Sequence, residues 1–181
     1  MATSPFNKQI SNRNFLSPVG FQFSLARYPK VSFFCNSTKI PQIVLQTEKQ
    51  STYLKQIDVP GDQLEYSDLT LRFLVDEDLV NYVTIHNWLT GLGFPESAKQ
   101  FDDMLNEDGI RDPLNFFSDG TLLILNSNYN AKAQIKFKDL FPVSLTSLDF
   151  TSTDTDIKYF TAEVSFKYTI YDILNLQNKP L

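Results

Sequence analysis

Zinc binding and nucleophilic catalysis are the first chemistries to test, because cysteine and histidine side chains can perform both. The 181-residue chain has a single cysteine, Cys35, and a single histidine, His86. These are too few for a protein-only zinc site, which needs several such ligands. Cys35 continues an alternating strand face with Val31 and Phe33, so we expect a small buried apolar residue. His86 falls in an expected helix, where a structural or surface histidine is the favoured interpretation.

Acidic side chains are the other source of potential chemistry. The run Asp76-Glu77-Asp78 lacks the spacing and central glycine of a calcium loop, and helix capping explains it without a metal. Paired carboxylates for glycoside hydrolysis stay open in principle, because the sequence does not give their separation. No phosphate-binding glycine loop precedes a helix, and no motif combines a nucleophile, a base and an orienting group. We therefore expect no enzyme, no cofactor and no metal.

The elements that would position these side chains are mainly strands. Alternating apolar and polar residues predict strands over 21–25, 31–35, 69–75, 122–125 and 133–137, and a long final strand over 160–170. Residues 37–62 suit a long excursion with one or two short strands. The sixteen Phe and eight Tyr also favour a pleated core. The expected class is mainly β (α+β), with a sandwich or small barrel.

One flanking helix is expected after the strand over 69–75. Asp76 would be its N-cap, and Tyr82, Ile85 and Leu89 recur at helical spacing. Glycines and a proline between 91 and 95 would end it. A short second helix over 100–105 is an open alternative within an acidic insert at about 94–120. The expected domain spans 14–174, with a flexible arm over 1–13 and a C-terminal tail over 175–181.

Charge is distributed unevenly along the chain. Residues 1–55 hold seven Lys and Arg against one Glu, whereas residues 56–119 hold three against fourteen Asp and Glu. This pattern indicates either ordinary solvated loops or a head-to-tail contact between copies. The sequence pI of about 4.8 argues against a basic nucleic-acid-binding face. No apolar run approaches the roughly 20 residues of a membrane span, so no membrane anchor is expected.

Three stretches in order resemble the tail-tube superfamily of contractile-tailed bacteriophages. The first runs from Pro60-Gly61-Asp62 to Phe73, and the second from Val75-Asp76-Glu77-Asp78 to Trp88. The third runs from Phe137-Lys138-Asp139 through a proline-containing corner to Tyr168. Each motif alone is weakly specific, and the inference depends on their order and spacing over about residues 14–173.

The resemblance implies a virion structural protein that forms a hexameric ring of the inner tail tube, a conduit for DNA ejection. In such a ring the sheets join edge to edge into an inner β-barrel. Its implied partners are further copies stacked head to tail, the tail sheath and baseplate or tail-end proteins, with assembly in the host cytoplasm. DNA would pass through without specific binding, which an acidic or neutral lining favours.

Particular residues follow as expectations from this resemblance. The channel lining would come from Thr161, Glu163, Ser165, Lys167 and Thr169, although the same row could be an ordinary solvated sheet face. Contacts between subunits or rings would come from Arg13, Asn14, Phe15, Asp62, Asp68, Asp102 and Asp103.

Two alternatives stay open beside the major tube subunit. A baseplate tube-initiating or tube-end ring protein of the same fold would explain the acidic insert. A ligand-binding β-sandwich module would instead present exposed aromatic platforms such as Tyr53, Phe117 and Tyr129.

Overall fold

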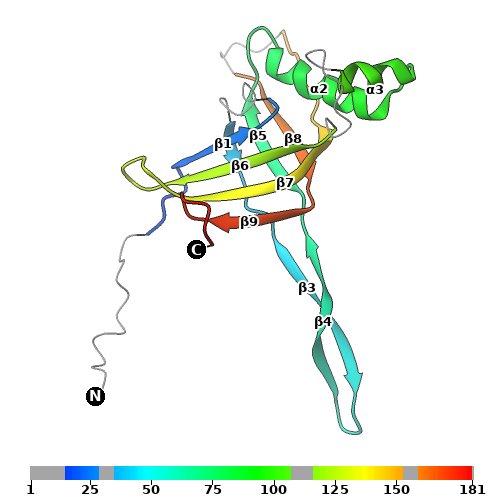
Figure 1. The fold of residues 1–181 in the computed structure, drawn as a ribbon, viewed down its shortest axis with the longest axis vertical. Coiled ribbons are helices and arrows are strands. Elements are labelled where there is room, and N and C mark those ends of the chain that lie inside the picture. The colour runs from blue at the N-terminus through cyan, green and yellow to red at the C-terminus, as the bar shows by residue number, and fades with distance from the viewer. Residues whose placement is uncertain (1–14, 29–34, 107–115, 153–158, 181) are drawn as a thin grey trace.

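The computed structural model describes residues 15–28, 35–106, 116–152 and 159–180. The described strands are β1 (Phe21–Leu25), β2 (Cys35–Thr38), β3 (Ile43–Ser51), β4 (Gln56–Tyr66), β5 (Leu69–Leu74), β6 (Ser118–Leu125), β7 (Ala131–Leu145), β8 (Thr161–Lys167) and β9 (Ile170–Leu174). The helices are α2 (Val80–Gly93) and α3 (Ala98–Leu105) (Figure 1). Neither of these helices is long and apolar enough to cross a membrane. The mainly β class is confirmed.

The long strand β7 joins two halves of one bent antiparallel sheet. Its first part lies between β6 and β9, and its last part pairs with β8, which continues to β5 and β2. Asp139, with a left-handed φ of 55°, marks the bend. Over the described residues the sheet does not close into a barrel within one chain. A ring of copies would therefore have to complete any barrel.

The expected final strand over 160–170 is two strands in the structure. β8 ends at Lys167 and β9 begins at Ile170, so Tyr168 and Thr169 form a break. The pairing with β7 keeps its register across the break, because Phe141 lies opposite Lys167 and Lys138 lies opposite Ile170. Both strands bend at this place, and the alternation of apolar residues in the sequence does not reveal a shared bend.

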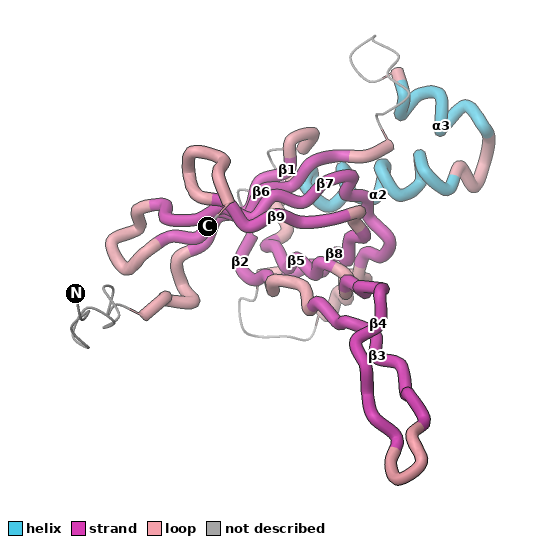
Figure 2. Tube along the Cα trace, turned by 60° about the horizontal axis from the view of Figure 1, so that its bottom comes forward, coloured by secondary structure: helices cyan, strands magenta, loops and turns pink. Residues whose placement is uncertain are grey.

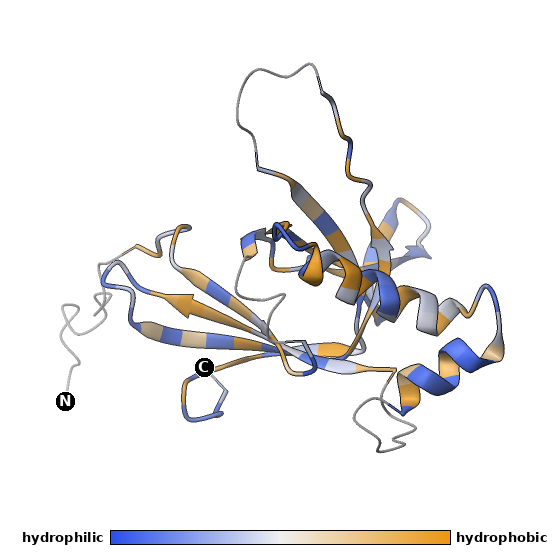
Figure 3. Ribbon diagram, turned by 90° about the horizontal axis from the view of Figure 1, so that it is seen from above, coloured by the Kyte–Doolittle hydropathy of each residue, from blue (hydrophilic) through white to orange (hydrophobic). Residues whose placement is uncertain are grey.

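The core lies inside this bent sheet and is closed at one end by α2. Apolar and polar residues alternate along the sheet's strands (Figure 3), and Ile85 and Trp88 enter the core from α2. The fully buried strand side chains are Phe23, Leu69, Leu71, Phe73, Ile135, Phe137, Leu140, Ala162, Val164 and Phe166. The indole Nε1 of Trp88 donates a hydrogen bond to the backbone oxygen of Phe116 across 3.2 Å. This bond ties α2 to the segment that enters β6.

The structure differs from the expected helices, or decides between alternatives, in two places. The first helix begins at Val80, not after Asp76, because Asp76 closes a turn: its backbone oxygen accepts from the Leu79 amide across 2.9 Å. Buried Asn81 then connects the helix to β5 by donating from Nδ2 to the Leu74 oxygen across 2.7 Å. The second concerns α3, where the short second helix left open over 100–105 is present over Ala98–Leu105. Its buried residues Met104 and Leu105 anchor it beside α2.

Strands β3 and β4 form a two-stranded arm that projects from the rest of the fold (Figures 1 and 2). The sequence predicted only one or two short strands here, and the structure has strands of nine and eleven residues. Pro60 and Gly61 obscured the longer strand, because both residues are disfavoured inside strands. The pairing register shifts between Leu45 and Thr47, where Gly61 faces Gln46. We call residues 43–66 the arm and the remaining elements the body.

The chain after β9 folds back onto the body. Amide Nε2 of Gln134 donates to the Asn175 backbone oxygen across 2.9 Å and to Asn178 Oδ1 across 2.8 Å. The expected C-terminal tail is therefore held against β7 over its described residues. The segment 94–120, expected as an acidic insert, contains α3 and the first residues of β6.

Candidate functional site: interaction surfaces

The residues with potential for metal or covalent chemistry lie apart. Cys35 is half-buried at the start of β2, and burial raises the pKa of its thiol to about 11. The expectation of a buried small residue is thus partly met. His86 is exposed on α2. Among the described residues, no group of three His, Cys, Asp or Glu side chains could hold a metal ion.

The residues expected to line a channel occupy the outward face of β8. Thr161, Glu163, Ser165 and Lys167 alternate there with three buried side chains. Thr169 lies beyond the end of β8, in the break before β9, so it does not share that strand. The structure therefore brings four of the five expected residues into one row.

Neighbouring strands add positive charge to this row. The guanidinium of Arg72 on β5 donates from Nη2 to Thr161 Oγ1 across 3.0 Å, and Arg72 lies opposite Glu163 in the pairing register. Lys39, Arg72 and Glu163 also line one hollow of about 300 Å³ beside β2. With Lys167, the described part of this face carries more cations than anions. Over its described residues this face therefore has no acidic excess of the kind that would repel DNA.

The residues expected at subunit contacts are spread over the molecule. Phe15 is 98% exposed, whereas Arg13 and Asn14 lie outside the described residues. Asp62 is on the arm and Asp68 follows it, while Asp102 and Asp103 are exposed on α3. The arm and α3 lie at opposite ends of the long axis in Figure 1. These acidic residues therefore belong to two separate surfaces.

Several large apolar side chains along the arm are exposed to solvent. Its exposed large apolar residues are Ile43, Val44, Leu45, Tyr53, Leu54, Ile57 and Leu64. At the tip, the side chains of Tyr53 and Leu54 are 101% and 91% exposed. An exposed apolar surface of this kind usually marks a protein–protein contact. The sequence analysis named only Tyr53 among these residues. The apolar run Ile43-Val44-Leu45 could have indicated the exposed apolar surface.

An aromatic cluster holds the base of the arm against the body. Rings of Tyr66, Phe137, Tyr168 and Tyr171 lie with centroids 5.2 to 6.1 Å apart. The Tyr171 hydroxyl donates to the oxygen of Pro41, just before β3, across 3.2 Å. Burial raises the pKa of Tyr168 to about 12. The cluster connects both legs of the arm to the segment around β9.

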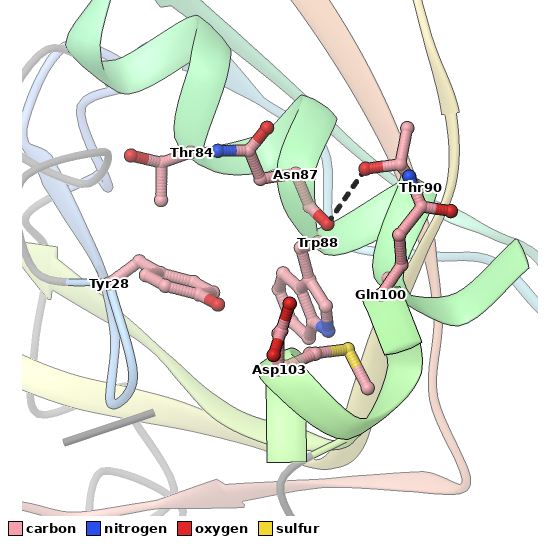
Figure 4. Close-up of a pocket in the computed structure, with 9 residues that line it drawn as sticks. Tyr28, Thr84, Asn87, Trp88, Thr90, Gln100 and Asp103 are labelled. Carbon is pink, nitrogen blue, oxygen red and sulfur yellow. Dashed lines mark hydrogen bonds between the residues drawn. The ribbon is translucent and has the colours of Figure 1, made fainter. Parts of the chain in front are cut away.

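A cavity of about 390 Å³ lies between α2 and α3 (Figure 4). Tyr28, Trp88, Gly91 and Met104 give it apolar walls, and Thr84, Asn87, Thr90, Gln100 and Asp103 supply polar groups. The rings of Tyr28 and Trp88 lie 5.2 Å apart at 57°. A Cβ at Gly91 would come within about 3 Å of the Met104 side chain, so the glycine lets the helices approach. We call this cavity the helix groove; sequence reasoning did not predict it.

Comparison with known protein families identifies the family of the chain. A family model described as "Phage tail tube protein" matches residues 2–174. The chain belongs to the phage tail tube protein family. No curated protein sequence matches the chain. The tail tube family is structural, so this chain is a tail tube-type structural protein and not an enzyme.

Solved structures of the same fold come from the anti-feeding prophage and from an extracellular contractile injection system, PVC. A chain of the anti-feeding prophage tube terminating cap is 14% identical, with a TM-score of 0.61 over 96% of this chain and 99% of that one. A chain of the extended PVC sheath-tube complex is 19% identical, with a TM-score of 0.58 over 97% and 100%. A chain of the anti-feeding prophage baseplate is 12% identical, with a TM-score of 0.53 over 98% and 99%. At these identities the likeness concerns the fold, and the expected tail-tube fold is confirmed.

Proposed function

We propose that copies of this chain form hexameric rings that stack head to tail into the inner tube of a contractile phage tail. The proposal extends the family's structural role to a stoichiometry, a partner set and a conduit for DNA. The observation that carries it is the arm, whose apolar side chains are exposed in one chain. Removing this surface from water would favour association by about 25 cal/mol for each Å² of apolar area that is buried.

The position of the arm supports contacts between unlike surfaces. The arm projects from one end of the body and the helix pair lies at the other (Figure 1). A contact between two different ends is heterologous, and repeated heterologous contacts produce rings or helical stacks. Each of β1 and β2 pairs with one strand among the described residues, so its outer edge is a candidate for sheet continuation within a ring. The sheath and the baseplate would be the further partners in the virion tail, assembled in the host cytoplasm.

A tube-end or tube-initiating ring is the second candidate. What favours it is the likeness to the cap and baseplate chains, which is similar in extent to the likeness to the sheath-tube chain. Such a ring would form hexamers that do not elongate without a template. The aromatic-platform alternative has less support, because Tyr53 lies at the arm tip and Tyr129 in the turn between β6 and β7, far apart in Figure 1.

Electron microscopy and native mass spectrometry of the purified protein test the proposal together. Stacked rings with a stain-filled channel and a mass of six chains per ring would support the tube subunit. Hexamers that stay single would support the tube-end ring. A protein that remains monomeric at high concentration and is missing from tail preparations would contradict both.

A further inference from the structure

The arm tip and the helix groove have complementary chemistry. The tip offers an aromatic ring, a branched apolar side chain and a cation in three consecutive residues, Tyr53, Leu54 and Lys55, all exposed. The helix groove is lined by two aromatic residues, the half-buried Tyr28 and, behind it, the buried Trp88.

The tip holds these side chains in a defined turn. Thr52 and Lys55 are joined by a backbone hydrogen bond from the Thr52 amide to the Lys55 oxygen across 3.3 Å. The Lys55 amide donates to Thr52 Oγ1 across 3.2 Å, and the Thr52 hydroxyl donates to the Lys55 oxygen. With the backbone closed on itself, Tyr53 and Leu54 project outward. Such a preorganised tip loses little entropy when it binds.

The helix groove suits an occupant that is apolar in the middle and charged at one side. Residue Trp88 is 1% exposed and its indole Nε1 is held by the Phe116 oxygen, so the core fixes this wall of the groove. Figure 4 shows Asp103 and Gln100 on α3 across the groove from Thr84 and Asn87 on α2. A carboxylate at the groove favours a cation beside the apolar group, since complementary charge fixes the orientation of a contact.

The tip cannot fill the groove of its own chain. The arm projects away from the body at one end of the long axis, and α2 and α3 lie at the other end (Figures 1 and 2). A second copy must therefore supply the tip.

We propose that Tyr53 and Leu54 at the arm tip of one copy enter the helix groove of the next copy, with Lys55 beside Asp103. This inference rests on the proposed head-to-tail assembly and names its contact. It also gives a use to the opposite charges of the two chain regions, because the tip belongs to the basic part and α3 to the acidic part. The contact is heterologous, so it propagates along a stack.

Disulfide trapping tests the contact directly. A chain carrying both Tyr53→Cys and Gln100→Cys should, under mild oxidation of preformed assemblies, produce a ladder of covalent multimers on non-reducing gels. The native Cys35 thiol should react slowly, because its pKa is raised to about 11. The matched control pairs Tyr53→Cys with Ser127→Cys in the exposed turn between β6 and β7, and it should produce no ladder. A ladder from the control and not from the test pair would overturn the proposal.

Charge exchange provides a second test that does not depend on oxidation. Lys55→Asp and Asp103→Lys should each lower the assembled fraction in sedimentation by about tenfold, and the double variant should restore it. Lys49→Asp makes the same charge change on the shaft of the arm, and Asp103→Lys should not rescue it. Normal assembly of both single variants, or rescue of Lys49→Asp as well, would contradict the contact.

The two levels of the proposal fail in different ways. If the unaltered chain forms no rings or tubes, the proposed function fails before the contact is tested. If the unaltered chain assembles, but the test pair does not cross-link and the charge exchange has no effect, the assembly stands and the tip binds elsewhere.

Discussion

The hydroxyl of Tyr168 donates a hydrogen bond to the backbone oxygen of Ser67 across 2.9 Å. Ser67 follows the second strand of the arm, and its amide donates across 3.0 Å to the oxygen of Gln42, which directly precedes the first strand. Tyr168 lies in the break between β8 and β9, where the sheet bends. The bend in the body and the base of the arm are therefore joined at one residue, which makes the direction of the arm depend on the body.

Loss of this hydroxyl should change the pH dependence of stability. Burial, as the main cause, raises the folded-state pKa of Tyr168 to about 12 from its ordinary value of 10.0. The neutral form is thus favoured in the folded state, and its contribution is fully present below about pH 10 and lost as the pH rises toward 12. Urea midpoints measured across this window should fall more steeply for the unaltered protein than for Tyr168→Phe. Tyr129→Phe, at an exposed turn, should behave like the unaltered protein.

Changes at the indole should separate packing from hydrogen bonding. Trp88→Ala removes a side chain that is 1% exposed and should lower the free energy of unfolding by about 3–5 kcal/mol. Trp88→Phe keeps most of the packing but leaves the Phe116 oxygen without this donor, which should cost about 1–3 kcal/mol. Denaturant unfolding measures both. Equal losses for the two variants would mean that the hydrogen bond, and not the packing, dominates.

A glycine on the arm should matter for assembly more than for folding. A Cβ at Gly61 would lie 2.6 Å from the backbone oxygen of Gln46, so Gly61→Ala must distort the arm. We expect body stability near that of the unaltered protein but shorter or fewer assemblies in electron microscopy. Gly93→Ala is the matched control, because nothing lies within 4 Å of its Cβ position at the end of α2. If Gly61→Ala assembles like the unaltered protein, the proposal that the arm takes part in the contact between copies is contradicted.

Thiol chemistry provides a check on the packing around β2. With a pKa of about 11, Cys35 has little thiolate near neutral pH and should be alkylated slowly in the folded protein. The rate measured by mass spectrometry should rise steeply with pH toward that value. In denaturant the rate at neutral pH should increase, because an unfolded thiol has a pKa near 8.5. Rapid alkylation of the folded protein at neutral pH would contradict the burial.

The sequence predicted the parts of the fold that bury one face. Alternation located β1, β5 and the Phe160–Ile170 region, because Phe73, Val164 and Phe166 face the core while their neighbours do not. It failed for the arm, since all of β3 is exposed and no core selects an alternating pattern there. The same limit applies to the helix groove, which depends on how Trp88 and Met104 meet across two helices. Interaction surfaces depend on such tertiary placement, and local periodicity does not encode it.

The outward row on β8 can be tested as a channel lining by its accessibility. Ser165→Cys places a thiol between Glu163 and Lys167 in that row. If the row lines a channel, a small maleimide should label assembled tubes while a maleimide on a large polymer should label only dissociated chains. Asn128→Cys, in the exposed turn between β6 and β7, is the control: in dissociated chains both reagents should label it, which shows that both are active. Equal labelling of Ser165→Cys by both reagents in intact tubes would place the row on the outer surface, and the cations Arg72 and Lys167 would then face other partners than DNA.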